Sequence, residues 1–354
     1  MGKLVSIVMP NYNYSMFIRQ ALDSALAQTY ENIEIIVVDD KSTDNSLEII
    51  EEYVKKDSRV KSYPNKKNLG VVASHNRCLE LAKGEYVVVL SSDDYLHPDF
   101  VKECVEYLDK YPTAGMVSSD VWYVDNDGTV TSPEPFYPES FFCKGQYQCK
   151  VWLFTNTFVP SQVLFRKEAV LDPEIGGAFS YLADTFIDTE LWFRLCLKYD
   201  FVYMKKKLAY YRMHMGSFSK SYENMKYFLQ FYLSRKRFGE LIRSNEYLAP
   251  HAKEAVKRTM RIGTRCLRTM LEAGDYKVAK QYLCLVEGLD PDVVEMPYYD
   301  FVMKCIENQS CEDMDTLRKL ENEYAEICKA PENRGKNGSA PYDLPEEVEI
   351  IEAK

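Results

Sequence analysis

The chain has 354 residues, of which 46% are hydrophobic, and it carries a formal net charge of −10. This length is enough for two domains with a substantial core. The acidic balance argues against nonspecific nucleic-acid binding, because such binding needs a basic surface that displaces counterions. The ten cysteines include no C-x-x-C pair, so we expect reduced thiols and no zinc site.

No apolar run in the sequence approaches the length that spans a bilayer. The first residues, MGKLVSIVMPNYN, also lack the long apolar segment and the small-residue cleavage site of a signal peptide. We therefore expect a cytoplasmic protein with no transmembrane segment.

Apolar runs and amphipathic segments alternate over the first 110 residues. Pro10 is expected to end the first strand, because it cannot donate to a sheet ladder, and Ser15 is expected to cap the first helix. The alternation is typical of a mainly parallel sheet covered by helices on both faces. The expected strands cover residues 5–9, 33–38, 60–63 and 86–90, and the expected helices cover residues 18–26, 47–54, 72–81 and 100–108.

The most informative stretch is EYVVVLSSDD at residues 85–94. Its five apolar or aromatic residues predict a strand buried on both faces, and two acids follow at the carboxyl end. Ligands bind at this edge of open α/β sheets. Asp93 and Asp94 repel each other unless a cation shares the site, and their oxygens suit Mg²⁺ or Mn²⁺. The local string alone favours the alternative, a solvated turn before the next helix.

The pattern changes after residue 110. Residues 116–131 predict two strands joined by an Asn-Asp-Gly turn. The segment 146–184 is aromatic-rich and weakly periodic, as loops that line a substrate cleft are. Asp188 begins an amphipathic helix, and strands are expected at 201–204 and 208–212.

Three regions follow from these patterns. Residues 1–220 are expected to form an α/β domain, and residues 221–330, which carry helical spacing only, a helical domain. The segment 271–291 resembles one helix-turn-helix unit of tetratricopeptide-type repeats, although a single unit favours a plain helical bundle. The tail, 331–354, is rich in Pro, Gly and Glu, so we expect it to be disordered.

Separated stretches of the chain resemble, in the correct order, the family 2 glycosyltransferases. The resemblance implies a Rossmann-like α/β fold of the GT-A type, which uses a nucleotide sugar, and the C-terminal all-helical domain lies outside it. The matching stretches are SIVMPNYNYSMFIRQALDSALAQTYENIEIIVVDDKSTDNS at 6–46, NLGVVASHN at 68–76, the pair Asp93-Asp94, FIDTELWFRL at 186–195 and YYRMHMGSFS at 210–219.

The resemblance implies a nucleotide pocket at the ends of the first two strands. Asp39 would accept the N3–H of a uracil, and the base pocket would be shaped by Pro10, Tyr12 and Asn13. The alternative, in which Asp39 and Asp40 cap the next helix, stays open, and more so for Asp40. The other residues that we assign to the nucleotide are Asp40, Asn68, Gly70, Asn76 and Asp93.

The resemblance also implies a metal site. Asp94 and Asp93 stand where the metal-binding motif of the family falls, and there they would hold the Mn²⁺ or Mg²⁺ that neutralises a leaving diphosphate. His214 is a candidate third ligand, with a purely structural histidine as the alternative. The chain departs from the family pattern at two positions: it has Ser91 where the first Asp of the motif is usual, and His75 where an Arg is usual.

Asp188 is the candidate general base. In an inverting single displacement, a carboxylate takes the proton of the acceptor hydroxyl as that hydroxyl attacks the anomeric carbon. The alternative for Asp188 is a helix N-cap, and Glu190 is a nearby rival for the catalytic role.

These residues together imply an inverting, metal-assisted transfer from a UDP-sugar to a glycan or lipid-linked acceptor in polysaccharide or glycoconjugate biosynthesis. Work at the inner face of the cell membrane and oligomers formed through the helical domain are compatible with this interpretation. Two alternatives stay open. Acids at strand ends also suit a nucleotidyl- or phosphoryltransferase, and the departures at Ser91 and His75 suit a non-catalytic nucleotide-sugar-binding protein.

Overall fold

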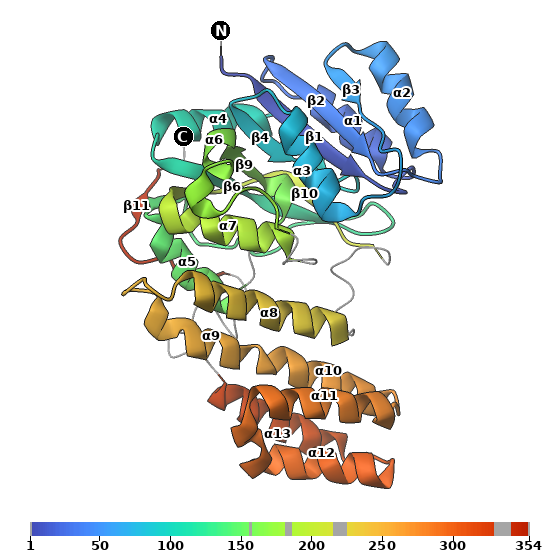
Figure 1. Cartoon of the computed structure of the whole chain (residues 1–354), viewed down its shortest axis with the longest axis vertical. Coiled ribbons are helices and arrows are strands. Elements are labelled where there is room, and N and C mark those ends of the chain that lie inside the picture. The colour runs from blue at the N-terminus through green and yellow to red at the C-terminus, as the bar shows by residue number, and fades with distance from the viewer. Residues whose placement is uncertain (1, 156–157, 181–185, 215–224, 329–340, 353–354) are drawn as a thin grey trace. The chain divides into compact units, whose positions relative to one another are not determined.

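The structure is a computed structural model (Figure 1). It describes residues 2–155, 158–180, 186–214, 225–328 and 341–352, with the backbone alone for 225–227. The chain divides into two compact units. Met1–Met215 and Arg334–Lys354 form the first, here called the sheet unit, and Gly216–Asn333 form the second, here called the helical unit. The expected boundary at residue 220 lies outside the described residues.

In the described part of the chain, the sheet unit holds one mixed sheet of eleven strands. Most strands run in one direction, and β8, β9, β5 and β7 run in the other, which confirms the expected mainly parallel GT-A architecture. Strand β5 (Tyr95–Leu96) pairs with β10, and β7 (Val130–Thr131) pairs with β6. The main path is β11 (Glu349–Ile350), β8 (Phe141–Cys143), β10 (Asp200–Arg212), β6 (Ala114–Val124), β9 (Val163–Arg166), β4 (Tyr86–Val89), β1 (Val5–Asn11), β2 (Ile33–Asp39) and β3 (Val60–Ser62).

Helices cover both faces of this sheet. Alternate residues of β1, such as Val5, Ile7 and Met9, join one buried cluster with the apolar stripes of α1, α2 and α4. Helix α3 packs against β1 and β2 without joining that cluster, as expected for the opposite face. The helices of this unit are α1 (Ile18–Leu26), α2 (Ser46–Lys56), α3 (Val71–Leu81), α4 (Phe100–Lys110), α5 (Gly145–Phe154), α6 (Lys167–Val170) and α7 (Ile187–Lys198).

The order of the strands creates the edge where the site lies. Strand β1 pairs in parallel with β2 on one side and with β4 on the other. The strands that follow β1 are therefore added first on one side of it and then on the other. Asn11 is opposite Asp39, and Val8 is opposite Val89. The carboxyl ends of β1, β2 and β4 therefore meet at one edge, which is the usual place for a ligand in an open α/β sheet.

Pro10 does not end β1, because the strand continues to Asn11. The carbonyl of Val8 points to β4, where it accepts from Leu90, so the backbone of Pro10 faces the same side. Strand β4 has already ended there, at Val89. The missing N–H of Pro10 therefore leaves no gap in a ladder.

Two other expectations also differ from the structure. Helix α1 begins at Ile18 without a side-chain cap, and Ser15 instead donates its backbone N–H to Asp44 (2.9 Å). The two strands expected at 201–204 and 208–212 are the single strand β10, with register shifts between Tyr203 and Ala209. These shifts break the alternation on which the sequence pattern depends.

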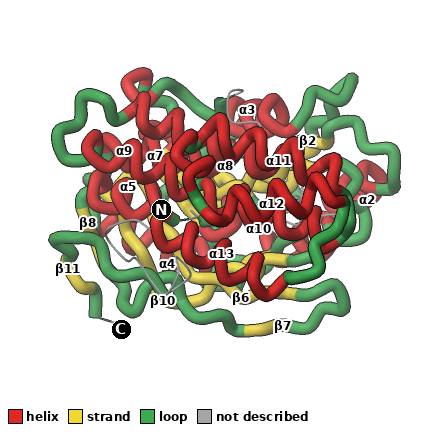
Figure 2. Tube along the Cα trace, turned by 90° about the horizontal axis from the view of Figure 1, so that it is seen from below, coloured by secondary structure: helices red, strands yellow, loops and turns green. Residues whose placement is uncertain are grey.

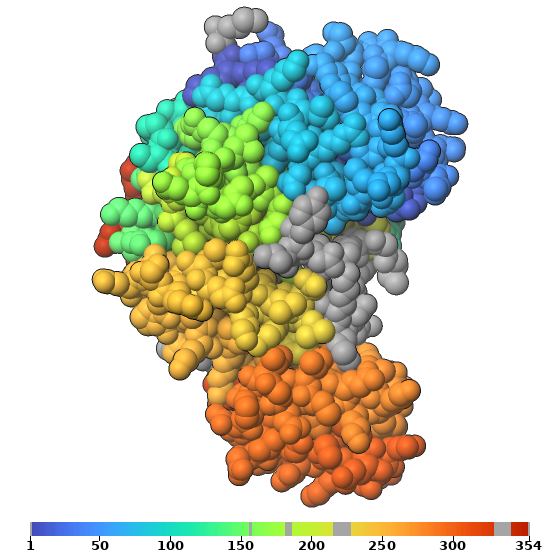
Figure 3. Space-filling model, in the orientation of Figure 1, coloured from blue at the N-terminus to red at the C-terminus, as the bar shows by residue number. Residues whose placement is uncertain are grey.

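The described part of the helical unit contains α8 to α13 (Figure 2). Helices α10 and α11 form a helix-turn-helix in which Gly274 has a φ of +73° and Asp275 accepts from the N–H of Val278 (3.1 Å). Side chains of α8 and of α10 to α13 share one buried cluster, and the unit presents a continuous surface in Figure 3. The bounds are α8 (Met225–Leu241), α9 (Ala252–Arg258), α10 (Met260–Glu272), α11 (Tyr276–Leu289), α12 (Pro297–Asn308) and α13 (Met314–Ile327). None of the helices that the structure describes has the length and apolar character needed to cross a bilayer.

The expected disorder of the tail is wrong for residues 341–352. Strand β11 pairs with β8, and Glu349 accepts from the hydroxyl of Tyr111 (2.8 Å). Ile351 is buried, and Glu346 forms an ion pair with Lys150 (2.8 Å). The remainder of the expected tail, residues 331–340 and 353–354, lies outside the described residues.

Candidate functional site

The carboxylate of Asp39 is fixed by three hydrogen bonds at the end of β2. Its Oδ2 accepts from Asn11 Nδ2 (2.8 Å) and Ser42 Oγ (2.6 Å), and its Oδ1 accepts from the N–H of Ser42 (2.9 Å). Because a carboxylate offers about four lone-pair positions, one position on Oδ1 stays available. Asp39 is 1% exposed, so it is a buried, oriented acceptor with one lone-pair position not used by these three hydrogen bonds.

Ser42 joins the loop after β1 to the loop after β2. Besides binding Asp39, its Oγ accepts from the N–H of Asn13 (2.9 Å), and the side chain of Asn13 accepts from the N–H of Thr43 (2.7 Å). Asn13 has a φ of +59°, a conformation that asparagine tolerates. Tyr12, on the same loop, is 44% exposed. The sequence analysis did not single out Ser42, so its role was missed.

Asp40 folds the next loop of the same edge. Its Oδ1 accepts from Asn65 Nδ2 (2.6 Å) and the N–H of Leu69 (2.8 Å), and its Oδ2 accepts from the N–H of Gly70 (2.8 Å). Asn68 also accepts from the N–H of Gly70 (3.1 Å). Asp40 thus orders the turn that precedes α3. Neither Asp39 nor Asp40 caps α2, whose N-cap, Asn45, makes no side-chain cap.

Asp93 and His214 meet where the ends of β4 and β10 come together. His214 Nε2 lies 3.1 Å from Asp93 Oδ2, and the imidazole packs on the rings of Tyr14 (5.9 Å) and Phe17 (5.0 Å). Burial, followed by the charges of Asp93 and Asp94, raises the pKa of Tyr14. The carboxylate of Asp93 and the imidazole of His214 thus lie together in a negatively charged region. Such a region is suited to a cation.

Asp94 points away from this pair. Its Oδ2 accepts from Ser161 Oγ (2.6 Å), and its Oδ1 accepts from the N–H of Arg212 (2.9 Å). Burial and the neighbouring Asp93 raise its pKa. Arg212 also donates through Nε to the carbonyl of Asp93 (2.9 Å). Of the three candidate ligands, the structure brings Asp93 and His214 together and turns Asp94 elsewhere.

The residues present fit a divalent cation in a limited sense. Within the described ranges, no group of three or more His, Cys, Asp or Glu side chains is arranged to hold a metal ion. Mg²⁺ and Mn²⁺ sites that bind a diphosphate commonly use only one or two protein ligands, and phosphate oxygens and water complete the shell. Asp93 and His214 meet that requirement.

Asp188 occupies the second position of α7. It is partly exposed, its Oδ1 accepts from the N–H of Thr189 (2.7 Å), and burial raises its pKa to about 6. Phe186, rather than Asp188, is the N-cap residue of α7. In the described part of the chain, Asp188 shares no hydrogen-bond partner with Asp39 or Asp93.

Glu190 has a structural partner instead. It is buried and forms an ion pair with Arg194 (2.8 Å), whose guanidinium also donates to the carbonyls of Ile175 (2.7 Å) and Ala178 (2.6 Å). This pair holds the loop in front of α7, which leaves Asp188 as the better placed of the two carboxylates to meet a ligand.

Helix α3 contributes two of the residues singled out from the sequence. The amide of Asn76 exchanges two hydrogen bonds of 2.9 Å with the backbone of Phe179, so its polar atoms tie α3 to the loop before α7. His75 is buried against the ring of Phe179, with Nδ1 2.7 Å from the carbonyl of Val71. Burial lowers the pKa of His75 to about 4, so it does not replace the charge of an arginine at neutral pH.

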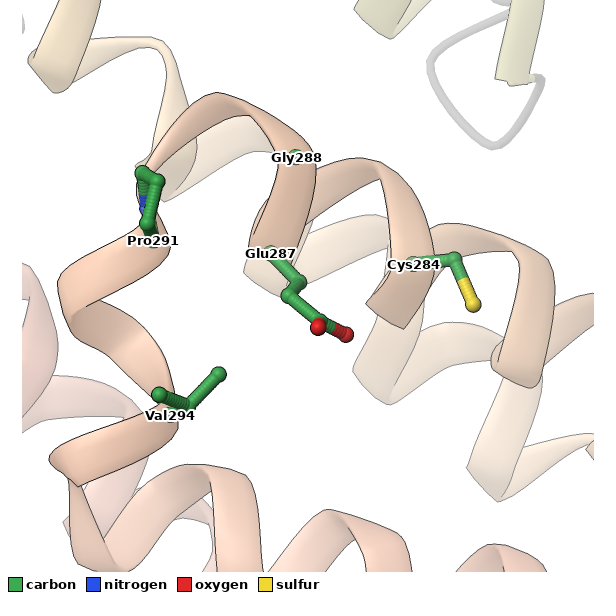
Figure 4. Close-up of a pocket in the computed structure, with 5 residues that line it drawn as sticks. All are labelled: Cys284, Glu287, Gly288, Pro291 and Val294. Atoms are coloured by element: carbon green, nitrogen blue, oxygen red, sulfur yellow. The ribbon is translucent and has the colours of Figure 1, made fainter.

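The helical unit has a hollow of about 490 Å³, lined by Cys284, Glu287, Gly288, Pro291 and Val294 (Figure 4). The carboxylate of Glu287 accepts from the hydroxyl of Tyr299 (3.1 Å). This hollow has one acid and one thiol among small or apolar residues, so it lacks the convergent polar groups that mark the sheet edge.

Comparison with known proteins agrees with this geometry. Residues 6–172 match the model of glycosyl transferase family 2. These residues are a family 2 glycosyltransferase domain. Its described part contains the Asp39 and Asp93 sides of the site, whereas His214 and Asp188 lie beyond the matched residues.

Relatives of this glycosyltransferase domain come from several bacteria. The glycosyltransferase GlyG of Streptococcus pneumoniae is 32% identical over 149 residues, which are 42% of this chain and 46% of that protein. The putative glycosyltransferase EpsH of Bacillus subtilis is 27% identical over 62% of this chain and 63% of its own length. Chondroitin synthase of Pasteurella multocida is 38% identical over 38% of this chain and 14% of its own length. The chain thus spans about half the length of the first two of these relatives, and a small part of the third.

Solved structures share the fold over nearly the whole chain, the helical unit included. S. aureus TarS 1-349 in complex with UDP-GlcNAc has a TM-score of 0.61 and 18% identity, covering 99% of this chain and 97% of that one. The mannosyltransferase PcManGT of Pyrobaculum calidifontis, in complex with GDP-Man and Mn²⁺, has a TM-score of 0.55 and 16% identity, covering 93% and 86%. At these identities the likeness concerns the fold alone.

Proposed function

We propose that this chain is an inverting glycosyltransferase that moves a sugar from a UDP-sugar to an acceptor hydroxyl with the help of a divalent cation. The observation that carries the proposal is the shared edge of the sheet. There the ends of β1 and β2 fix one acceptor, Asp39, and the ends of β4 and β10 bring Asp93 and His214 within 3.1 Å. The UDP-GlcNAc complex of TarS, which has the same fold, supports the choice of donor.

The hydrogen bonds of Asp39 favour uracil. Uracil presents one ring N–H between two carbonyls, which matches the single position left on Oδ1. Guanine presents N1–H beside an amino group, and the second donor would stay unpaired at a cost of about 1–3 kcal/mol. In this proposal Pro10, at the end of β1, and Tyr12 and Asn13, which follow that strand, would shape the base pocket.

Asp93 and His214 would hold Mn²⁺ or Mg²⁺ beside the diphosphate. When bound, the cation supplies positive charge that stabilises the leaving UDP. Asp40, Asn68 and Gly70 act on the donor indirectly in this proposal, by ordering the turn before α3.

Asp188 would take the proton of the acceptor hydroxyl. As the hydroxyl oxygen bonds to the anomeric carbon, the bond from that carbon to the UDP oxygen breaks and the proton passes to the carboxylate of Asp188. A pKa of about 6 leaves this group ionised at neutral pH, yet basic enough to accept a proton. The likeness to a chondroitin synthase supports a glycan acceptor, and a lipid-linked acceptor, action at the inner membrane face and an oligomer formed by the helical unit belong to the same proposal.

The test measures nucleotide release from a panel of UDP- and GDP-sugars, with Mn²⁺ and with a chelator. The proposal predicts metal-dependent UDP release from at least one UDP-sugar and none from the GDP-sugars. Pyrophosphate release would favour a nucleotidyltransferase. Tight binding of UDP without turnover for any sugar or added glycan would favour a non-catalytic binding protein.

A further inference from the structure

The contact between Asp93 and His214 depends on a crossing segment of the chain. Strands β4 and β10 are not neighbours, because β9 and β6 lie between them in the sheet. After β4 the chain crosses to β10, where β5 pairs with it in antiparallel fashion, with Leu96 opposite Ala209. The rings of Tyr95 and Tyr210 stack there with centroids 4.3 Å apart. The contacts that hold this crossing segment in place therefore also set the distance between the side chains of Asp93 and His214.

Asp94 and Arg212 provide the fastening. The N–H of Arg212 donates to Asp94 Oδ1 (2.9 Å), and the side chain of Arg212 donates back through Nε to the carbonyl of Asp93 (2.9 Å). These two bonds run in opposite directions between the same two segments. His214 follows Arg212 by two residues, so its position is set by the same contact.

We propose that Asp94 and Arg212 are positioning residues that hold Asp93 and His214 together, and that Asp94 is not itself a metal ligand. This inference rests on the proposed function. It departs from the sequence-based interpretation, which assigned both Asp94 and Asp93 to the metal from the resemblance to the family motif.

The surroundings of Asp94 support this division of roles. Asp94 as a whole residue is 2% exposed, whereas the side chain of Asp93 is 15% exposed. Ser161, which donates to Asp94, also accepts from the N–H of Ser91 (3.1 Å), so the carboxylate is anchored to the start of the turn as well as to β10. Rotating Asp94 toward a cation would break both of these hydrogen bonds and leave buried polar groups without a partner, which is unfavourable.

The guanidinium of Arg212 is likewise committed to the protein. It lies over the ring of Phe17 (4.8 Å) and donates to Gln20 Oε1 (2.5 Å), and the residue is 5% exposed. Phe17 is the N-cap residue of α1 and Gln20 lies in its first turn, so the start of α1 packs against Arg212. Arg212 is therefore placed to brace Asp93 rather than to contact a phosphate.

The experiment measures Mn²⁺ affinity for the UDP complex by titration calorimetry, together with UDP affinity in a chelator. Asp94→Asn is the decisive variant. Its Oδ1 can still accept from Arg212, and its Nδ2 can donate to Ser161 Oγ, so a positioning role survives while a ligating charge is lost. We expect Asp94→Asn to stay within about threefold of wild type in Mn²⁺ affinity, and Asp93→Asn and Asp94→Ala to lose about tenfold or more.

Arg212→Met tests the other half of the contact. It keeps an apolar stem over Phe17 but removes the bond to the carbonyl of Asp93. We expect Mn²⁺ affinity to fall about five- to tenfold, with UDP affinity in a chelator unchanged. Arg19→Met, on α1, removes an exposed ion pair with Glu52 of α2; it is the control and should leave both affinities unchanged.

The outcomes separate this inference from the proposed function. Equal losses in Asp94→Asn and Asp93→Asn, or an unchanged Arg212→Met, would overturn the positioning role while the proposed function stands. A wild-type protein that binds neither UDP nor Mn²⁺ would overturn the proposed function instead. If Asp94→Ala fails to fold, Asp94→Asn and Arg212→Met still decide.

Discussion

The end of β2 and the start of α7 each present one carboxylate that the proposed mechanism needs, and they hold it by opposite means. Asp39 accepts from Asn11 and twice from Ser42, whereas Asp188 accepts from the backbone N–H of Thr189 and has a pKa that burial raises to about 6. Hydrogen bonds to the ionised form favour it, and burial disfavours it. The difference fits the two proposed roles: an oriented acceptor for the nucleotide, and a group with a pKa near 6 that exchanges a proton.

The largest expected effect comes from removing the exchangeable carboxylate. Asp188→Asn should slow sugar transfer by about a hundredfold or more, because the acceptor hydroxyl then loses its base. UDP affinity should stay within about twofold, since Asp188 lies outside the Asp39 hydrogen bonds. Stopped assays of UDP release and titration of UDP measure the two quantities. Glu174→Gln, an exposed change near the same loop, is the control, and a normal rate in Asp188→Asn would remove it from the role.

Ser42→Ala attacks the other side of the comparison. Without the hydroxyl, Asp39 Oδ2 and the N–H of Asn13 each lose a partner, and the two loops lose their link. We expect UDP affinity to fall about tenfold, which corresponds to about 1.4 kcal/mol, with little change in the rate of bound donor. The comparison variant is Thr43→Ala on the same turn, which removes only the longer bond from the Thr43 hydroxyl to Asn13 Oδ1 (3.3 Å) and should have the smaller effect. Retained affinity in Ser42→Ala would show that the nucleotide does not depend on this oriented acceptor.

The pH dependence should distinguish the two carboxylates without any mutation. As the pH is lowered, the rate at saturating donor should fall to half near pH 6 and then by about tenfold for each further pH unit, because Asp188 must be ionised to accept a proton. UDP binding should not follow this curve. A rate that is flat between pH 5 and 7, measured with buffers of matched ionic strength, would contradict the assignment.

A smaller effect is expected on stability. Folding raises the pKa of Asp188 from the ordinary value of about 3.9 to about 6, so its ionisation destabilises the folded state as the pH rises from about 4 to about 6 and by a constant amount above that. Asp188→Asn should therefore unfold at the same or a higher temperature than wild type at pH 8, and without that advantage near pH 4. Thermal unfolding at both values checks the sign, and a lower unfolding temperature at pH 8 counts against it.

The sequence predicted the sheet better than the connections between its parts. Buried apolar runs marked β1, β2 and β4, and the acids after them had to share an edge because parallel neighbours end together. Ser42 and Asn13 are 29 positions apart, and Ser161 and Asp94 are 67 apart. Such pairs depend on strand order, which local periodicity does not contain, so neither the role of Ser42 nor the direction of Asp94 was predictable.

The tail illustrates the same limit. Its composition predicted disorder, yet Tyr342 packs on the rings of Phe136 (6.1 Å) and Tyr137 (5.7 Å), and Ile351 is buried. A few anchoring residues are enough to order a polar segment when a sheet edge such as β8 is available to pair with it. Composition averages those few residues away.

The central claim is that the sheet edge binds a uridine nucleotide through Asp39. The most direct test is calorimetric titration of UDP, with Mn²⁺ present, into the wild-type protein and into Asp39→Asn. In the variant, an amide NH₂ group replaces one of the two oxygens that accept hydrogen bonds in the wild type. The account predicts that UDP affinity falls about tenfold or more in Asp39→Asn. Equal UDP affinity in the two proteins would contradict it.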